Sequence, residues 1–330
     1  MMATDEDSQR RILTQIAAVA WEHPADRAAL NALRRIPGFD LVLRKIFALF
    51  GERALRLAFK ANAVRTSENQ YARVHARLAR VCEVLDVEKP PECYISQTPI
   101  VNAGAVGFGE PFIVLNSSML EILSEDEVEA VLGHEVGHIL SGHVLYRTLL
   151  ILVLNLVILR YTLAGLALRP ILMALMEWYR KSELSSDRAG LLAVQNPRIA
   201  MSALMQLAGG TRGISLDLDE FIAQSDEYRA GGDLLDAVYK VLNVLGQTHP
   251  FAVIRVAELR DWIESGEYDR VLSGEYQRRG EKDDRPYHED LRAAMKGYQE
   301  GAREIFDEVD AAVDRLRGRL TDAFKGRKEG

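Results

Sequence analysis

Apolar and polar residues recur at helical spacing over most of the chain, so the pattern predicts a mainly helical protein. We expect residues 9–66 to be helical, with breaks at His23-Pro24 and Pro37-Gly38. Residues 39–64 place apolar side chains along one helix face, with Arg and Lys between them. Such a stretch packs on its own domain or lies on a membrane surface; the first is commoner, and the sequence leaves both open.

The pattern changes between residues 92 and 116. The runs ECYISQ, PIVNAGAVG and PFIVLNS are short, rich in β-forming residues and broken by Pro and Gly. They predict a small antiparallel sheet. Helical patterns then resume and continue almost to the C-terminus, so we expect a mainly helical α+β fold.

The last stretch of the chain, residues 287–325, is a charged, heptad-like amphipathic segment. It is expected to cap the domain or to join two copies in a homo-oligomer. Three parts follow from these patterns. They are an N-terminal helical segment (1–66), a central domain (67–280) and a C-terminal amphipathic helix (281–330).

Composition restricts the possible functions. The 330 residues include 41 basic and 48 acidic side chains, a net charge of −7, which offers no basic surface for nucleic acid. Two cysteines cannot frame a disulfide-rich secreted fold. The first residues, MMATDEDSQRR, lack the apolar core of a signal peptide. We therefore expect a cytoplasmic protein.

The segment SEDEVEAVLGHEVGHILSGH carries the candidate chemistry. Ser124 and Glu127 form a capping-box pattern, so a helix should begin there. His134 and His138 are then one helical turn apart on the same face and can reach one zinc ion, with Glu135 beside the position of a water molecule. This is the HExxH pattern of zinc proteases, in which the glutamate acts as general base.

A catalytic zinc site needs a third protein ligand. His143 would fit the longer pattern HExxHxxGxxH only if residue 141 were Gly and residue 144 were His, and neither is. A second helix offers Glu183 and Asp187, again four residues apart. We assign Glu183 as the ligand and Asp187 as the acceptor behind a ligand imidazole. Surface ion pairs with neighbouring arginines are the alternative for both.

The hydrophobic stretch 148–168, interrupted by Asn155 and Arg160, lies between these two ligand segments. It approaches the length of a membrane span, but a single crossing would separate the ligands by a bilayer. Two full spans do not fit between Val144 and Tyr179. We therefore expect a hydrophobic hairpin over about 144–179. It would be packed away, enter one leaflet of a membrane, or mediate self-association.

These elements together resemble the HtpX-like and CAAX prenyl protease family of zinc metallopeptidases. The resemblance covers roughly residues 68–265 and rests on four elements in order. They are NAGAVGFGEPFIVLNSSMLEIL (102–123), HEVGH (134–138), ELSSDRAG (183–190), and Thr248-His249-Pro250 followed by Arg255. Two departures stand out. No N-terminal membrane helix is evident, and Phe251 replaces the second proline of the family's Thr-His-Pro-Pro.

The resemblance implies a zincin-type core, with a small sheet beside the HExxH helix and a second helix carrying the glutamate ligand. It implies one zinc ion per chain. His249 would stabilise the oxyanion, and Arg255 would hold the carboxylates of the second helix. Asn102, Ala103 and Gly104 would lie on the edge strand that pairs with an extended substrate.

We expect a zinc-dependent endopeptidase whose substrates are unfolded or membrane-associated polypeptides. Contact with the cytoplasmic face of a membrane through residues 148–168 remains open. The alternatives are a catalytically silent zinc scaffold, a membrane-surface module and an exopeptidase. Retention of Glu135 opposes the scaffold, because a purely structural site needs no base. We also hypothesise that the hydrophobic insert or the C-terminal helix covers the cleft and keeps the enzyme latent.

Overall fold

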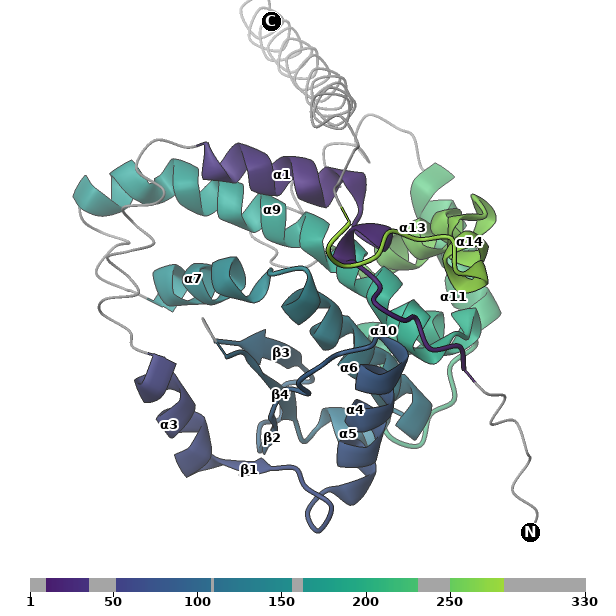
Figure 1. Ribbon diagram of the computed structural model, residues 1–330, viewed down its shortest axis with the longest axis horizontal. Helices are drawn as coiled ribbons and strands as arrows, with labels where there is room; N and C mark the ends of the chain where they lie inside the picture. Colours follow the sequence, from purple (N-terminus) through teal and green to yellow (C-terminus); the bar gives the residue numbers. More distant parts are fainter. Residues whose placement is uncertain (1–9, 36–51, 108–109, 156–162, 231–249, 282–330) are drawn as a thin grey trace, which may run out of the picture. The chain divides into compact units, whose positions relative to one another are not determined.

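The computed structural model describes residues 10–35, 52–107, 110–155, 163–230 and 250–281 (Figure 1). Nearly all of them belong to one compact unit, Met1–Asp226 with Thr248–Asp283. In chain order the elements are the 3₁₀ helix η1 (Ala18–Ala20), α1 (Pro24–Arg34), α3 (Glu52–Asn62), β1 (Ala63–Arg65), α4 (Ala72–Val84), β2 (Cys93–Ser96), β3 (Ala103–Val106), β4 (Phe112–Asn116), α5 (Met119–Ile122), α6 (Glu125–Leu140), α7 (Val144–Asn155), α9 (Leu163–Val194), α10 (Pro197–Gly209), α11 (Leu218–Ala230), α13 (Ala252–Glu264) and α14 (Glu267–Ser273).

The described sheet has four strands in the order β1-β2-β4-β3, which confirms the α+β fold. It is mixed rather than wholly antiparallel as expected, because β2 and β4 run parallel while the outer pairs are antiparallel. The chain passes from β2 to the edge strand β3 and returns as β4 between them. Alternation of side chains sets which face is buried and carries no information on strand direction.

Helix α6 begins where the capping box predicts. Glu127 N donates to Ser124 Oγ at 3.3 Å, and Ser124 N donates to Glu127 Oε2 at 2.7 Å. These bonds satisfy two backbone N–H groups at the helix start. Most of the helix is buried in the main core, against the sheet, α4, α9 and α10.

Glycines allow α6 and α9 to touch. A Cβ atom at Gly133 would lie 2.5 Å from Ala193 Cβ, and one at Gly137 would lie 2.5 Å from Ala189 Cβ. Gly190 presents the same bare backbone to α6 from the opposite side. The two helices therefore approach to a distance that larger side chains would prevent, and this brings their polar residues together.

Two parts of the expected N-terminal helical segment are not helical. Over residues 10–22 only the short η1 is helical, and this stretch bonds to distant backbone, for example Leu13 N to Val84 O at 2.8 Å. Leu13, Ile16 and Trp21 are buried in the core. Residues 63–65 form β1 because β2 offers a free edge for pairing. Tertiary contacts outweigh local propensity at both places.

The hydrophobic insert comprises α7 and the first half of α9, which pack on each other. Residues 156–162 between them lie outside the described residues, as does the predicted C-terminal helix. Within the described part of the chain, no helix has both the length and the hydropathy needed to cross a bilayer. Helix α1 lies alongside α9 (Figure 1).

Candidate metal site and catalytic cleft

Three side chains from α6 and α9 converge at the contact between the helices. His138 Nε2 lies 3.1 Å from His134 Nε2 and 3.3 Å from Glu183 Oε1. One ligand atom from each of the three residues lies within 4.8 Å of the others, a spacing that could hold a metal ion. The structure thus brings together the residues that the sequence singled out as ligands.

Asp187 and Arg255 lie behind His134. His134 Nδ1 is 2.9 Å from Asp187 Oδ1, and the Arg255 guanidinium donates to both oxygens of that carboxylate, at 2.5 and 2.8 Å. Burial alone would raise the pKa of Asp187, but Arg255 and His134 hold it below its usual value. An ionised Asp187 accepts the Nδ1 proton of His134, so the lone pair of His134 Nε2 points towards the other ligands.

The electrostatics of the cluster suit a cation. Burial lowers the pKa of His138 to about 3. Burial also acts against the charged form of His134, but its hydrogen bonds to Asp187 and Glu183 prevail and raise its pKa to about 9. Two imidazole nitrogens and one carboxylate oxygen that face one another repel unless a proton or a metal lies among them. Two histidines and one carboxylate are also the donor set of a catalytic zinc.

Glu135 lies beside the ligands, with its carboxylate directed at the edge strand. Ala105 N donates to Glu135 Oε2 at 2.6 Å, and Arg147 Nη1 donates to the same oxygen at 2.9 Å. Burial would raise the pKa of Glu135, but Arg147 opposes this and holds it below its usual value. The carboxylate is therefore ionised and able to take a proton.

Helix α7 covers the outer edge of β3. Besides Glu135, the Arg147 guanidinium binds Ala103 O at 3.1 Å, and Thr148 Oγ1 lies 3.2 Å from both Gly107 N and Gly107 O. A Cβ atom at Gly104 would lie 3.2 Å from Arg147 Nη2. Backbone groups that an extended substrate would need for pairing are thus bound by side chains of this chain.

The structure describes some of the other predicted site residues and not others. Ala103 and Gly104 lie on β3, and Asn102 directly precedes it. His249 lies outside the described residues. His143 is no ligand in this arrangement; its Nδ1 lies 3.1 Å from His138 Nδ1. Arg147 was not singled out from the sequence, because an arginine that directly precedes a hydrophobic stretch gives no signal of contact with a carboxylate 12 residues earlier.

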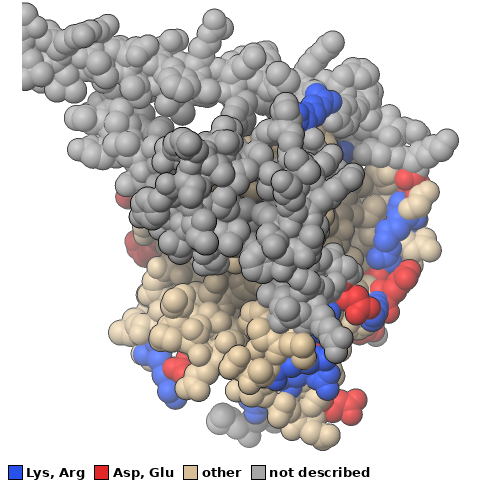
Figure 2. Space-filling view, turned by 90° about the vertical axis from the view of Figure 1, so that its left-hand side faces the viewer, with Lys and Arg blue, Asp and Glu red and all other residues tan. Residues whose placement is uncertain are grey.

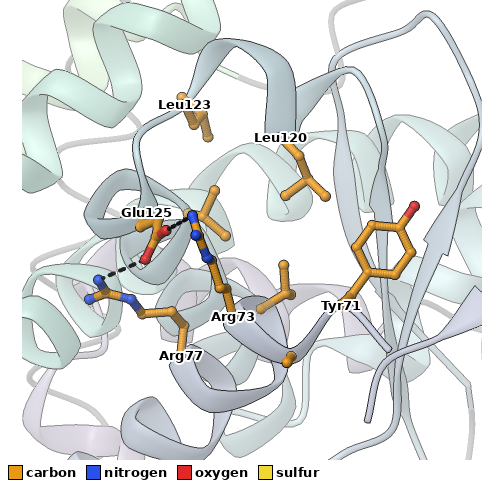
Figure 3. Close-up of a pocket in the computed structure, with 9 residues that line it drawn as sticks. Tyr71, Arg73, Arg77, Leu120, Leu123 and Glu125 are labelled. Atoms are coloured by element: carbon orange, nitrogen blue, oxygen red, sulfur yellow. Dashed lines mark hydrogen bonds and ion pairs between the residues drawn. The ribbon is translucent and has the colours of Figure 1, made fainter. Parts of the chain in front are cut away.

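A separate hollow of about 470 Å³ is lined by α4, α5 and the start of α6 (Figure 3). Its floor includes Leu120 and Leu123, and its rim carries Arg73, Arg77 and Glu125. The rim charges pair with one another, as in the 2.8 Å contact between Arg73 Nη1 and Glu125 Oε1. The hollow contains none of the candidate site residues.

Comparison with known proteins gives consistent results. Residues 68–263 match peptidase family M48. The chain is 33% identical over 261 residues to the plastoglobule-localized metallopeptidase 48 of Arabidopsis thaliana chloroplasts, with 76% of this chain and 74% of that protein covered. It is 35% identical over 86 residues to a protease HtpX homolog of Helicobacter pylori, covering 26% and 27% of the two chains.

Protease HtpX of Xylella fastidiosa is 32% identical to this chain over 126 residues, which cover 35% of this chain and 43% of the relative. The chain thus spans less than half of the length of each of these two bacterial relatives. No solved structure matches the chain.

Proposed function

Because the chain belongs to peptidase family M48, and is therefore a metallopeptidase that hydrolyses peptide bonds, we propose that it is a zinc-dependent endopeptidase. His134, His138 and Glu183 would hold the zinc, and Glu135 would act as general base. The observation that carries the proposal is the convergence of the three ligands next to a buried, ionised glutamate that faces an edge strand.

When bound, zinc supplies a Lewis acid that activates water and polarises a peptide carbonyl. Glu135 would accept a proton from the attacking water and deliver it to the leaving amine. Asp187, held by Arg255, would keep His134 in the tautomer that binds metal. We retain His249 as the predicted donor to the oxyanion. Loss of one such donor typically costs about 100- to 1000-fold in turnover.

The substrate would bind as an additional strand on β3. Ala103 O and Ala105 N point away from β4, and an extended polypeptide would pair with them by displacing the Arg147 and Glu135 side chains that now bind them. Backbone pairing demands little of the substrate sequence, so unfolded or membrane-associated polypeptides are the proposed substrates. An exopeptidase would also need a charged group to bind a chain terminus.

We also propose contact with the surface of a membrane. Leu57 of α3, Ile151 of α7 and Met173 of α9 are apolar and exposed by 55%, 40% and 56%. On the side shown in Figure 2, the described surface carries uncharged side chains over a continuous area, with Lys and Arg among them in its lower part. Location in the cytoplasm, at the cytoplasmic face of a membrane, stays a prediction, and so does self-association through the C-terminal helix.

The test compares wild type with Glu135→Gln on an unfolded protein substrate, with the zinc content of each measured. Glu121→Gln makes the same chemical change at an exposed position and serves as the control. Internal cleavage by wild type and the control, but not by Glu135→Gln at equal zinc content, is the expected result. Bound zinc without cleavage by any of the three would favour a latent enzyme or the scaffold. If the chain were only a membrane-surface module, wild type and Glu135→Gln would bind liposomes equally well and neither would cleave the substrate.

A further inference from the structure

A chain of hydrogen bonds extends from His138 to the N-terminal region. On the Nδ1 side of its ring, His138 lies 3.1 Å from His143 Nδ1, and His143 Nε2 lies 3.0 Å from Asp26 Oδ2. His138 is 0% exposed, and His143 and Asp26 are each 1% exposed, so water does not compete for these contacts. Asp26 belongs to α1, which precedes the region that matches family M48.

The positions of the protons in this series of hydrogen bonds follow from its last member, the Asp26 carboxylate. A carboxylate can only accept, so His143 carries a proton on Nε2 and leaves its Nδ1 as an acceptor. His138 must then carry its proton on Nδ1, because two facing nitrogens form a hydrogen bond only when one of them donates. The lone pair of His138 Nε2 therefore points at His134 and Glu183, as a metal ligand requires.

Asp26 is itself held in place from α9. Ser185 Oγ donates to Asp26 Oδ2 at 2.6 Å, and His23 N donates to Ser185 Oγ at 2.9 Å. Ser185 lies two residues after the ligand Glu183. The start of α1 is thereby joined to α6 through His143, which lies three residues beyond the end of that helix and contacts its His138, and to α9 through Ser185.

We propose that Asp26 is a positioning residue for the metal site, which acts through His143 to fix the tautomer and orientation of His138. It mirrors the role of Asp187 behind His134, from a part of the chain outside the family match. The inference rests on the proposed zinc site. It implies that α1 is a working part of the metal centre.

The experiment measures the dissociation constant for zinc by competition with a chelator, on full-length wild type and Asp26→Asn. Removal of an outer partner typically weakens metal binding about 10- to 100-fold, and we expect a loss in this range. Asp86→Asn is the control. Asp86 also holds the N-terminal region, by accepting from Gln15 N at 2.6 Å, but it has no contact with the histidines among the described residues.

A second variant separates positioning from general destabilisation. His143→Phe keeps an aromatic ring beside Trp178 but removes the relay. In that background Asp26→Asn should weaken zinc binding no further, because the two residues act in series. The visible spectrum of the cobalt-substituted protein should change in both single variants.

Two outcomes would overturn the inference. One is a zinc dissociation constant for Asp26→Asn within twofold of wild type, whatever its melting temperature. The other is an equal effect of Asp26→Asn with and without His143. Wild type that takes up no zinc at all would instead overturn the proposed function on which the inference rests.

Discussion

Arg147 and Glu135 form a buried ion pair, with 2.9 Å between Arg147 Nη1 and Glu135 Oε2. The same guanidinium binds Ala103 O on the edge strand. It therefore lowers the proton affinity of the proposed base and occupies a backbone group that the substrate would use. The arrangement agrees with the hypothesis that part of the hydrophobic insert keeps the enzyme latent.

Replacement of Arg147 by Gln is expected to raise kcat/KM for an unfolded substrate. A hydrogen bond to a charged group is worth about 1.5–3 kcal/mol, and 1.36 kcal/mol corresponds to a factor of ten, so about tenfold or more is expected. Arg180→Gln is the control, because it makes the same change at an arginine that pairs with Glu177, three residues earlier on α9. A fall in kcat/KM at full zinc content would show that Arg147 assists the reaction.

The close contact of α6 with α9 makes a second prediction. Gly137→Ala should lower the free energy of unfolding by about 1–3 kcal/mol, because the new methyl group overlaps Ala189. Zinc binding should weaken with it, since the ligand helices move apart. Gly209→Ala in α10 meets no atom within 4 Å and is the control. Denaturant unfolding and zinc titration test both, and an equally stable Gly137→Ala would refute the prediction.

Asp187→Asn should weaken zinc binding about 10- to 100-fold, because the amide no longer fixes the Nδ1 proton of His134. It also leaves the buried Arg255 without its principal partner, so the melting temperature should fall. Asp219→Asn removes an exposed partner of Arg198 and should leave both quantities unchanged. Chelator competition and thermal unfolding measure the two effects. Unchanged zinc affinity would mean that His134 is held by other contacts.

Inhibitors should distinguish a metallopeptidase from a thiol-dependent one. Cys82 and Cys93 are each 2% exposed, and burial raises the pKa of both thiols to about 12. The folded enzyme should therefore keep its activity in iodoacetamide at pH 8 and lose it in 1,10-phenanthroline, with recovery on addition of zinc. Rapid alkylation with loss of cleavage would contradict this expectation.

The centre of the site could be predicted because its spacing is local. Positions i and i+4 on a helix share a face whatever the tertiary fold, so His134 with His138, and Glu183 with Asp187, followed from the sequence. The two pairs meet because small residues such as Gly137 let the helices approach. The sequence alone does not show that these small residues lie at a helix contact. The three short runs rich in β-forming residues are also local features of the sequence, and β2, β3 and β4 lie within them.

Asp26 and Arg147, which also lie near the centre, could not be predicted, because their partners are distant or atypical. Asp26 is more than a hundred positions from His143, and Arg147 lies in a run that otherwise reads as apolar. The direction of β2 relative to β4 depends on the order in which the chain crosses the sheet. The strand β1 exists only because a partner edge is available, so its own residues carry little signal.

The direct contact between α6 and α9 also affects which parts of the sequence can change during evolution. Because glycine and alanine surfaces hold the ligand helices together, the insert that joins them is not needed as a brace for the metal. Its length and sequence are free to change as long as it leaves one helix and returns to the other. Grafting an insert of different design between His143 and Tyr179 should therefore leave the three proposed zinc ligands in contact, while the loss of Arg147 with the native insert should free Glu135 and Ala103 O from its guanidinium.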